Sequence, residues 1–482
     1  MLTYDQKDRI GFTYIMNLIE PASPYGRDAL RCMIPAQPGQ EEMLSKELQN
    51  IEKAITSLLQ NEESYKRLET LLGQTKDIRE SISRIGAKLS EVDLFELKRY
   101  LLQLDQIVPL FNEINEEAKY NDITLESAEP ALKILDPEHS GVATFHISGK
   151  SFPILAEIRN EKKEIERKLR LAQSAEEKTE LNVLRSKIAA SEQKEEQKAA
   201  MWLSKKLQPW RDVLSQNAQA IGRLDFTIQK AKLAIKYKTC MPEIGGESVG
   251  FTDMTNPQLH ETLLKSGGSF TALSIKLCKG TTVITGANMG GKSVALKTLA
   301  LNVLLIHNGF YPFAARASCP LLDSVYLISE NLEASDRGLS SFGGEIVRFQ
   351  EILNDMRNAK TIILLDEFAR GTNPDEGQAI VRAVCAYMNN QNAYTVMTTH
   401  YEGVAPTAKA HYQVAGLRKM ELTKPLIAEI QSLKVSERIA SIAKYMDYGL
   451  LKVSPDERLP EDTTNICKLL GLEKGIMDLV EI

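Results

Sequence analysis

The stretch from Thr285 to Ser293 constrains the fold of this chain more than any other part of its sequence. It consists of Thr-Gly-Ala-Asn-Met-Gly-Gly-Lys-Ser and fits the spacing G-x-x-x-x-G-K-[ST], in which backbone N–H groups surround a phosphate. The apolar, β-branched residues 281–284 before it predict a buried parallel strand, and residues 294–304 after it predict a helix. A glycine-rich turn with an unrelated lysine is the alternative, and the flanking strand and helix disfavour it.

The residues of such a loop divide into a phosphate cradle and a metal ligand. Lys292 is expected to reach the β- and γ-phosphates of a nucleotide, and Ser293 to hold Mg²⁺ through its hydroxyl. The N-terminus of the following helix adds positive potential at the same place. The residues predicted to bind the nucleotide are consecutive in the loop and the first helical turn: Gly286, Ala287, Asn288, Met289, Gly290, Gly291, Lys292, Ser293 and Val294.

A second apolar run, residues 361–365, ends in two carboxylates, those of Asp366 and Glu367, and has the form of a Walker B element. An aspartate in this place can support Mg²⁺, and the adjacent glutamate can orient or deprotonate a water. A further strand, residues 393–399, ends at His400, which we expect to hydrogen-bond a γ-phosphate, although a histidine after a strand is more often structural. The predicted catalytic residues are Lys292, Glu367 and His400, and the predicted Mg²⁺ ligands are Ser293 and Asp366.

Composition limits the class of protein. With 482 residues, 43% of them hydrophobic and 26% charged, the chain has the length and composition of a globular protein with about two to four domains. It has no apolar run of membrane-spanning length and no signal-peptide pattern at its start. The six cysteines form no C-x-x-C pair, so we expect free thiols, a cytoplasmic protein and no membrane partner. A net charge of −5 disfavours an overall basic surface but leaves a local basic patch open.

The first half of the chain has helical patterns. Apolar residues spaced alternately by four and three positions predict one buried helical stripe: Leu44, Leu48, Ile51, Ile55 and Leu58. From Pro153 to Lys206 acidic and basic residues alternate, with few glycines or prolines. This pattern is typical of one or two long, solvent-exposed helices, and a charged linker is the alternative.

The sequence pattern changes near residues 242–246. Beyond them β-branched runs alternate with predicted helices, as in a parallel sheet wound with helices. We therefore place the main domain boundary there. The predicted domains are a helical core (1–152), a helical lever or arm that returns to the core (153–244), a P-loop domain (245–455) and a C-terminal helical segment (456–482).

Three motifs together resemble the MutS family of ATPases, within the ABC-type class. They are the loop at 285–293, the sequence Asp-Glu-Phe-Ala-Arg-Gly-Thr-Asn at 366–373, and Thr-Thr-His-Tyr at 398–401. The resemblance is strong over about 255–402 and weaker over 1–240. It implies an α/β P-loop ATPase domain of the MutS type, preceded by a mainly α-helical core and lever domain, with ATP and Mg²⁺ as cofactors.

The resemblance also implies two further site residues. Residues 338–342, Gly-Leu-Ser-Ser-Phe, look like the family's G-x-S-T-F segment, whose serine reaches the partner's γ-phosphate across a dimer; Ser340 is the corresponding residue. Phe270 lies where the family places an aromatic that stacks on adenine, and a core phenylalanine before a strand is an equal alternative. The family thus implies a homodimer with two composite sites, in which the nucleotide state moves the arm.

The sequence departs from the MutS mismatch readers in ways that leave its client open. We find no N-terminal domain with a Phe-x-Glu wedge, the lever region looks too short for a clamp domain, and we expect no added nuclease-like domain. One hypothesis is an ATPase that binds DNA, weakly and without sequence preference, in repair or recombination. The other is a protein-remodelling ATPase with a protein client, as for truncated MutS-like proteins associated with cobalamin-dependent amino-acid mutases. A small-molecule kinase is disfavoured because no substrate-binding insertion lies near the loop.

Overall fold

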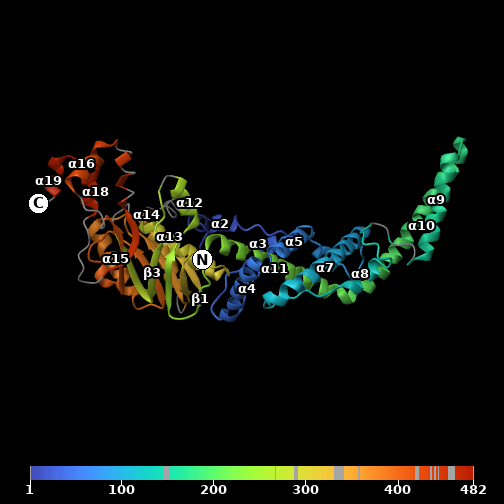
Figure 1. The fold of residues 1–482 in the computed structure, drawn as a ribbon, viewed down its shortest axis with the longest axis horizontal. Helices are drawn as coiled ribbons and strands as arrows, with labels where there is room; N and C mark the ends of the chain where they lie inside the picture. The colour runs from blue at the N-terminus through green and yellow to red at the C-terminus, as the bar shows by residue number, and fades with distance from the viewer. Residues whose placement is uncertain are drawn as a thin grey trace. The chain divides into compact units, whose positions relative to one another are not determined.

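The chain divides into two units in a computed structural model (Figure 1). One unit comprises residues 1–19, 33–52 and 232–482, and the other comprises residues 20–32 and 53–231. The structure describes residues 2–144, 147, 151–265, 268–286, 291–329, 341–356, 359–417, 423–434, 437–438, 441–442, 445–453 and 462–480. We call the unit that contains residues 232–482 the α/β unit and the other the helical unit.

The larger sheet of the α/β unit has six strands, and all neighbours except β10 and β9 run parallel. Its strands are, in spatial order, β10 (Asp447–Lys452), β9 (Ala410–Gly416), β4 (Gly280–Thr285), β8 (Ala393–Thr398), β7 (Thr361–Asp366) and β6 (Ser324–Ser329). The central strands are buried along their whole length, as expected for a parallel sheet covered on both faces. The strands predicted at 281–284, 361–365 and 393–399 are therefore confirmed, with small shifts at their ends.

A second sheet of four strands accompanies the first. Its spatial order is β1 (Glu243–Ile244), β5 (Arg316–Cys319), β2 (Ser248–Met254) and β3 (Leu273–Cys278). The pairs of β2 with β3 and β5 are antiparallel, and β1 pairs with β5 in parallel. Burial alternates along β3, which indicates that one face of this sheet packs and the other is open.

Helices cover both faces of the larger sheet. Helix α13 (Lys292–His307) is buried on all sides and contacts β2 as well as β6, β7 and β8. On the opposite face, α14 (Ser341–Asp355) and α15 (Pro374–Met388) place Phe349, Ile352, Val381 and Cys385 in one apolar cluster with residues of β4, β7 and β8. The predicted helix at 294–304 is confirmed as part of α13.

Shorter elements complete the α/β unit. They are α1 (Tyr4–Arg9), α2 (Phe12–Met16), α12 (Pro257–Lys265), the 3₁₀ turn η2 (Ala405–Thr407), α16 (Lys424–Ser432), α18 (Asp462–Leu470) and α19 (Lys474–Val480). The N-terminal segments are tied in by hydrogen bonds: the buried Gln6 amide donates to the Leu327 carbonyl at 2.8 Å, and the Tyr311 hydroxyl donates to the Leu48 carbonyl at 3.1 Å.

The helical unit contains no strand among its described residues. Its helices are α3 (Pro24–Arg31), α5 (Glu62–Gly73), α6 (Arg79–Ser83), α7 (Glu91–Ala118), α8 (Glu129–Leu135), α9 (Pro153–Leu171), α10 (Ala175–Leu207) and the 3₁₀ turn η1 (Gln208–Trp210). Helices α4 (Glu41–Gln60) and α11 (Arg211–Tyr237) contribute residues to both units. A buried carboxylate, that of Asp225, accepts hydrogen bonds from the Ser23 N–H at 2.7 Å and the Ser23 hydroxyl at 2.6 Å, which fixes the start of α3.

Helices form in the first half of the chain where the sequence predicts them. Leu44, Leu48 and Ile51 are fully buried on α4, as the spacing predicts. The charged stretch after Pro153 forms two helices, α9 and α10, which pack side by side (Figure 1), so the linker alternative is wrong. Pro153 is the first residue of α9, where its missing N–H costs nothing. Among the described residues no helix is long and apolar enough to cross a membrane.

Candidate nucleotide site

The predicted phosphate loop connects the buried strand β4 to the buried helix α13. Gly286, directly after β4, has a φ of +135°, and Gly291, directly before α13, has a φ of +82°. Both angles lie in a region that side chains disfavour, which explains why glycine stands at each end of the loop. The four residues between them, Ala287, Asn288, Met289 and Gly290, lie outside the described residues.

Lys292 is the first residue of α13, and its side chain is almost fully buried. The ammonium donates to the Gly286 carbonyl at 2.8 Å and lies 3.6 Å from Oε1 of Glu367 and 3.0 Å from Nε2 of His400. Burial lowers the pKa of Lys292, and the carboxylates of Glu367 and Asp366 oppose that shift. A buried cation facing carboxylates is an arrangement in which an anionic phosphate could replace the carboxylate as partner.

The two predicted metal ligands meet each other. The Ser293 hydroxyl donates to Oδ1 of Asp366 at 3.0 Å, although the two residues belong to α13 and β7. Thr398, which lies beside Asp366 in the sheet, donates to the same carboxylate oxygen at 2.8 Å. A hydroxyl and a carboxylate oxygen in contact fit Mg²⁺, which takes few protein ligands and completes its shell with phosphate and water. Among the described residues there is no group of three or more His, Cys, Asp or Glu side chains that could hold a metal ion.

Glu367 is held by three cations or donors. His400 Nε2 donates to its Oε1 at 2.6 Å, Arg370 donates to its Oε2 at 2.6 Å, and Lys292 lies close to Oε1. The hydrogen bond from His400 is the largest cause that lowers the pKa of Glu367, to about 2, against the effect of burial. Glu367 is therefore ionised at neutral pH.

The structure brings together some of the predicted residues and not others. Those brought together lie at the carboxyl edge of the larger sheet or in the first turn of α13: Gly286, Gly291, Lys292, Ser293, Asp366, Glu367 and His400. Val294 follows in α13 and is partly buried. Phe270 is partly buried, with its ring 6.3 Å from that of His260, and none of its described contacts reaches the loop. Ser340 lies outside the described residues.

Three residues beside the site were not predicted from the sequence. Thr398 joins Asp366 to the backbone N–H of Glu367, which donates to the threonine hydroxyl at 2.8 Å. Arg370 neutralises Glu367 from only three positions away in the chain. The ring of Tyr448, on β10, lies so close to Gly291 that a Cβ there would sit 3.1 Å from its Cδ1. Thr398 and Arg370 lie within the quoted motifs and could have been considered, whereas nothing in the sequence around Tyr448 places it beside the loop.

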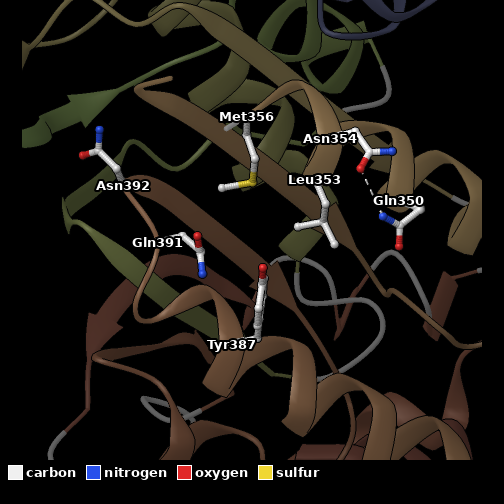
Figure 2. A pocket seen from close by; sticks show the side chains of 7 residues that line it. All are labelled: Gln350, Leu353, Asn354, Met356, Tyr387, Gln391 and Asn392. Carbon is white, nitrogen blue, oxygen red and sulfur yellow. Dashed lines mark hydrogen bonds between the residues drawn. The ribbon is translucent and has the colours of Figure 1, made fainter. Parts of the chain in front are cut away.

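A hollow of about 500 Å³ lies elsewhere in the α/β unit, between the ends of α14 and α15 (Figure 2). Carboxamides, two apolar side chains and a tyrosine line it: Gln350, Leu353, Asn354, Met356, Tyr387, Gln391 and Asn392. Asn392 directly precedes β8, so the hollow is at the amino edge of the sheet, whereas His400 follows the carboxyl end of that strand. It includes none of the predicted site residues, and we assign it no chemistry.

A parallel sheet with this loop, this buried lysine and these carboxylates defines a P-loop nucleotide-binding domain. Residues 282–468 match the family model of MutS domain V, and that domain is a P-loop ATPase domain. Together with the relatives described next, this match supports a protein of the MutS family.

Several curated relatives with matching sequences carry the name Endonuclease MutS2. The protein of that name from Leuconostoc mesenteroides subsp. mesenteroides is 28% identical over 346 residues, which cover 70% of this chain and 41% of the relative. The one from Acetivibrio thermocellus is 31% identical over 200 residues, covering 39% of this chain and 24% of the relative. The one from Ligilactobacillus salivarius is 31% identical over 216 residues, covering 43% and 26%. The chain thus spans less than half the length of these relatives.

The depressed pKa of Glu367 predicts a pH-dependent contribution to stability. Since the pKa in the folded protein is about 2 and the ordinary value is 4.5, the ionised carboxylate stabilises the fold above about pH 4.5, and this stabilisation is lost as the pH falls towards 2. Glu367→Gln should therefore lower the free energy of unfolding near neutral pH by about 1 kcal/mol, a value reduced for solvent screening. The difference from the parent should shrink below about pH 4.5.

Urea midpoints measured across this pH range check the prediction. Glu376→Gln is the matched control, because Glu376 is exposed in the first turn of α15 and should show no such pH-dependent difference. A difference for Glu367→Gln that stays constant with pH would contradict the assignment of the depressed pKa to this residue.

Proposed function

We propose that the chain is a Mg²⁺-dependent ATPase whose hydrolytic site is formed at the carboxyl edge of the larger sheet. One observation carries the proposal: the Lys292 ammonium, the Ser293–Asp366 pair and the ionised Glu367 converge there from the start of α13 and the end of β7. These are the groups that phosphoryl transfer to water needs, namely a cation for the phosphates, ligands for Mg²⁺ and an anion that orients the water. The similarity to the MutS family supports ATP as the nucleotide.

Each residue has one task in this proposal. Backbone N–H groups of the loop and the start of α13 bind the phosphates, and Lys292 transfers its ion pair from Glu367 to the β- and γ-phosphates. Ser293 and Asp366 hold the metal, which neutralises charge on the phosphate oxygens when bound. Glu367 orients the attacking water, and His400, which already donates to Glu367, lies within reach of the terminal phosphate. Phe270 stacks on adenine in this proposal.

Lys292→Ala should abolish ATP hydrolysis or reduce it by about 100-fold or more, because the phosphate loses its buried cationic partner. Lys297→Ala is the matched control: Lys297 is on the same helix and makes no described contact with the site. Phosphate release under saturating Mg²⁺ and ATP measures both. Hydrolysis by Lys292→Ala at the parental rate would mean that the loop does not bind the reacting phosphates.

We further propose that two copies of the chain associate through their α/β units and that Ser340 completes the partner's site. The proposal rests on the similarity to the MutS family. Glu367→Gln should then retain ATP and accumulate as a dimer, because the amide cannot support hydrolysis. Sedimentation with ATP and Mg²⁺ distinguishes it from Lys292→Ala, which should remain monomeric. A Glu367→Gln variant that is monomeric under all conditions would refute the composite site.

DNA is the client that we propose, in repair or recombination, with the α9–α10 arm responding to the nucleotide state. The relatives named Endonuclease MutS2 support this choice and give no support to a protein-remodelling role. Acidic and basic side chains alternate along the arm rather than gathering bases on one stretch. Several of its bases are paired with its own acids, as in Arg159 with Glu192 at 3.2 Å and Arg185 with Glu166 at 3.4 Å.

DNA binding should therefore be weak, independent of sequence and steeply reduced by salt, since affinity that comes from phosphate contacts depends on counterion release. It should show no preference for a mismatched over a matched duplex. Fluorescence anisotropy titrations of both duplexes at low and physiological salt test this. A mismatch preference that survives physiological salt would require a base-reading element that we have not identified.

A further inference from the structure

The loop that follows β7 has an unusual backbone. Glu367 has a φ of +51° and Ala369 a φ of +61°, and neither residue is glycine. Each left-handed residue of this kind costs about 1–2 kcal/mol relative to an ordinary conformation. Two such residues within three positions persist only where the surroundings hold them in place.

Both polar groups of the Ala369 backbone are held by side chains from distant parts of the chain. Its N–H donates to Oε2 of Glu345, on α14, at 2.9 Å. Its carbonyl accepts a hydrogen bond from the Tyr401 hydroxyl, beyond the end of β8, also at 2.9 Å. Ala369 is fully buried and Glu345 is 1% exposed, so water does not compete for these bonds. We call this arrangement the Ala369 clamp.

Helix α15 has a glycine where the Ala369 clamp approaches it, which leaves space for the Tyr401 hydroxyl. Gly377, on α15, lies so close that a Cβ there would overlap the Tyr401 hydroxyl and approach the Ala369 carbonyl to 3.0 Å. Burial raises the pKa of Tyr401, and the neighbouring Glu345 carboxylate adds to the effect. The hydroxyl therefore stays protonated at neutral pH and remains a donor. Residues of α14, α15 and the segment after β8 thus surround the backbone of a single residue, Ala369.

The Ala369 clamp acts next to the group that orients water in the proposed reaction. Glu367 is two residues before Ala369, and its carboxylate reaches His400 and Arg370 from this left-handed turn. We propose that Glu345 and Tyr401 are positioning residues for ATP hydrolysis, which keep Glu367 in its reactive orientation by fixing Ala369. This inference rests on the proposed ATPase function. The competing explanation is that the two side chains only stabilise the fold.

Two substitutions that each remove one hydrogen bond of the Ala369 clamp separate these explanations. Tyr401→Phe removes only the hydroxyl, and Glu345→Met removes the acceptor at similar length. Both variants should lower kcat by about 10-fold while KM stays within about 2-fold, because misplacement of a reacting group affects the chemical step more than binding. Glu345→Gln keeps an acceptor oxygen and should restore most of the rate. The matched controls are Tyr387→Phe, at a half-exposed tyrosine of α15, and Glu351→Met, at a partly exposed glutamate of α14; both should behave as the parent.

Amide hydrogen exchange, read by mass spectrometry without nucleotide, provides the second measurement. Exchange in peptides covering residues 367–371 should rise in Tyr401→Phe and Glu345→Met, while exchange in β4 and β7 stays at the parental level. Parental kcat together with parental exchange would overturn the inference. So would a general rise in exchange across the sheet with kcat and KM changing together, since that is the result of a merely structural role. If the parent itself fails to hydrolyse ATP, the proposed function fails, and exchange in residues 367–371 alone decides whether the Ala369 clamp exists.

Discussion

The buried ammonium of Lys292 is the constraint to which the rest of the site responds. A charge at the start of a fully buried helix has lost its water and must find partners among protein groups. The Gly286 carbonyl, Glu367 and the more distant charge of Asp366 provide them. Because these groups come from the ends of β4 and β7, the lysine also fixes the distance between the phosphate loop and the Walker B carboxylates.

The ion pair between Lys292 and Glu367 explains why the site is suited to an exchange in which a phosphate replaces Glu367 as the partner of Lys292. Glu367 is surrounded by positive or donating groups, and its pKa of about 2 measures how strongly they hold its charge. A phosphate that draws Lys292 away removes one of the groups that stabilise the Glu367 carboxylate. His400 and Arg370 stay in place beside it. Nucleotide binding would thus free one side of the carboxylate for a water while the other side stays fixed, without any large movement of the backbone.

Local sequence patterns predicted the elements of the site correctly. Short β-branched runs gave β4, β7 and β8, the apolar run after the loop is part of α13, and the spacing of Leu44, Leu48 and Ile51 placed the buried face of α4. These features depend on neighbours within a few residues, so periodicity and glycine content were sufficient. The role of Thr398 depends on the register between β7 and β8, and that of Tyr448 on β10 joining the far edge of the sheet; both are long-range pairings that a single sequence does not encode locally. The second sheet was not predicted for the same reason, since the paired residues of β1 and β5 are 75 positions apart in the chain.

The backbone after β7 has a conformation that depends on hydrogen bonds from distant parts of the chain, and this conformation places Glu367 in the site. Neither Glu367 nor Ala369 has a side chain that favours a left-handed backbone, so the local sequence argues against the turn that the structure contains. The conformation is imposed by groups from α14, from the end of β8 and from the segment beyond it, through Glu345, Thr398 and Tyr401. A strained turn held by buried hydrogen bonds has one geometry rather than several, because any relaxation would leave a buried donor or acceptor without a partner. The strain at Glu367 is therefore the consequence of placing its carboxylate against Lys292 and His400, and the side chains that enforce it form part of the site as much as those that would touch a nucleotide.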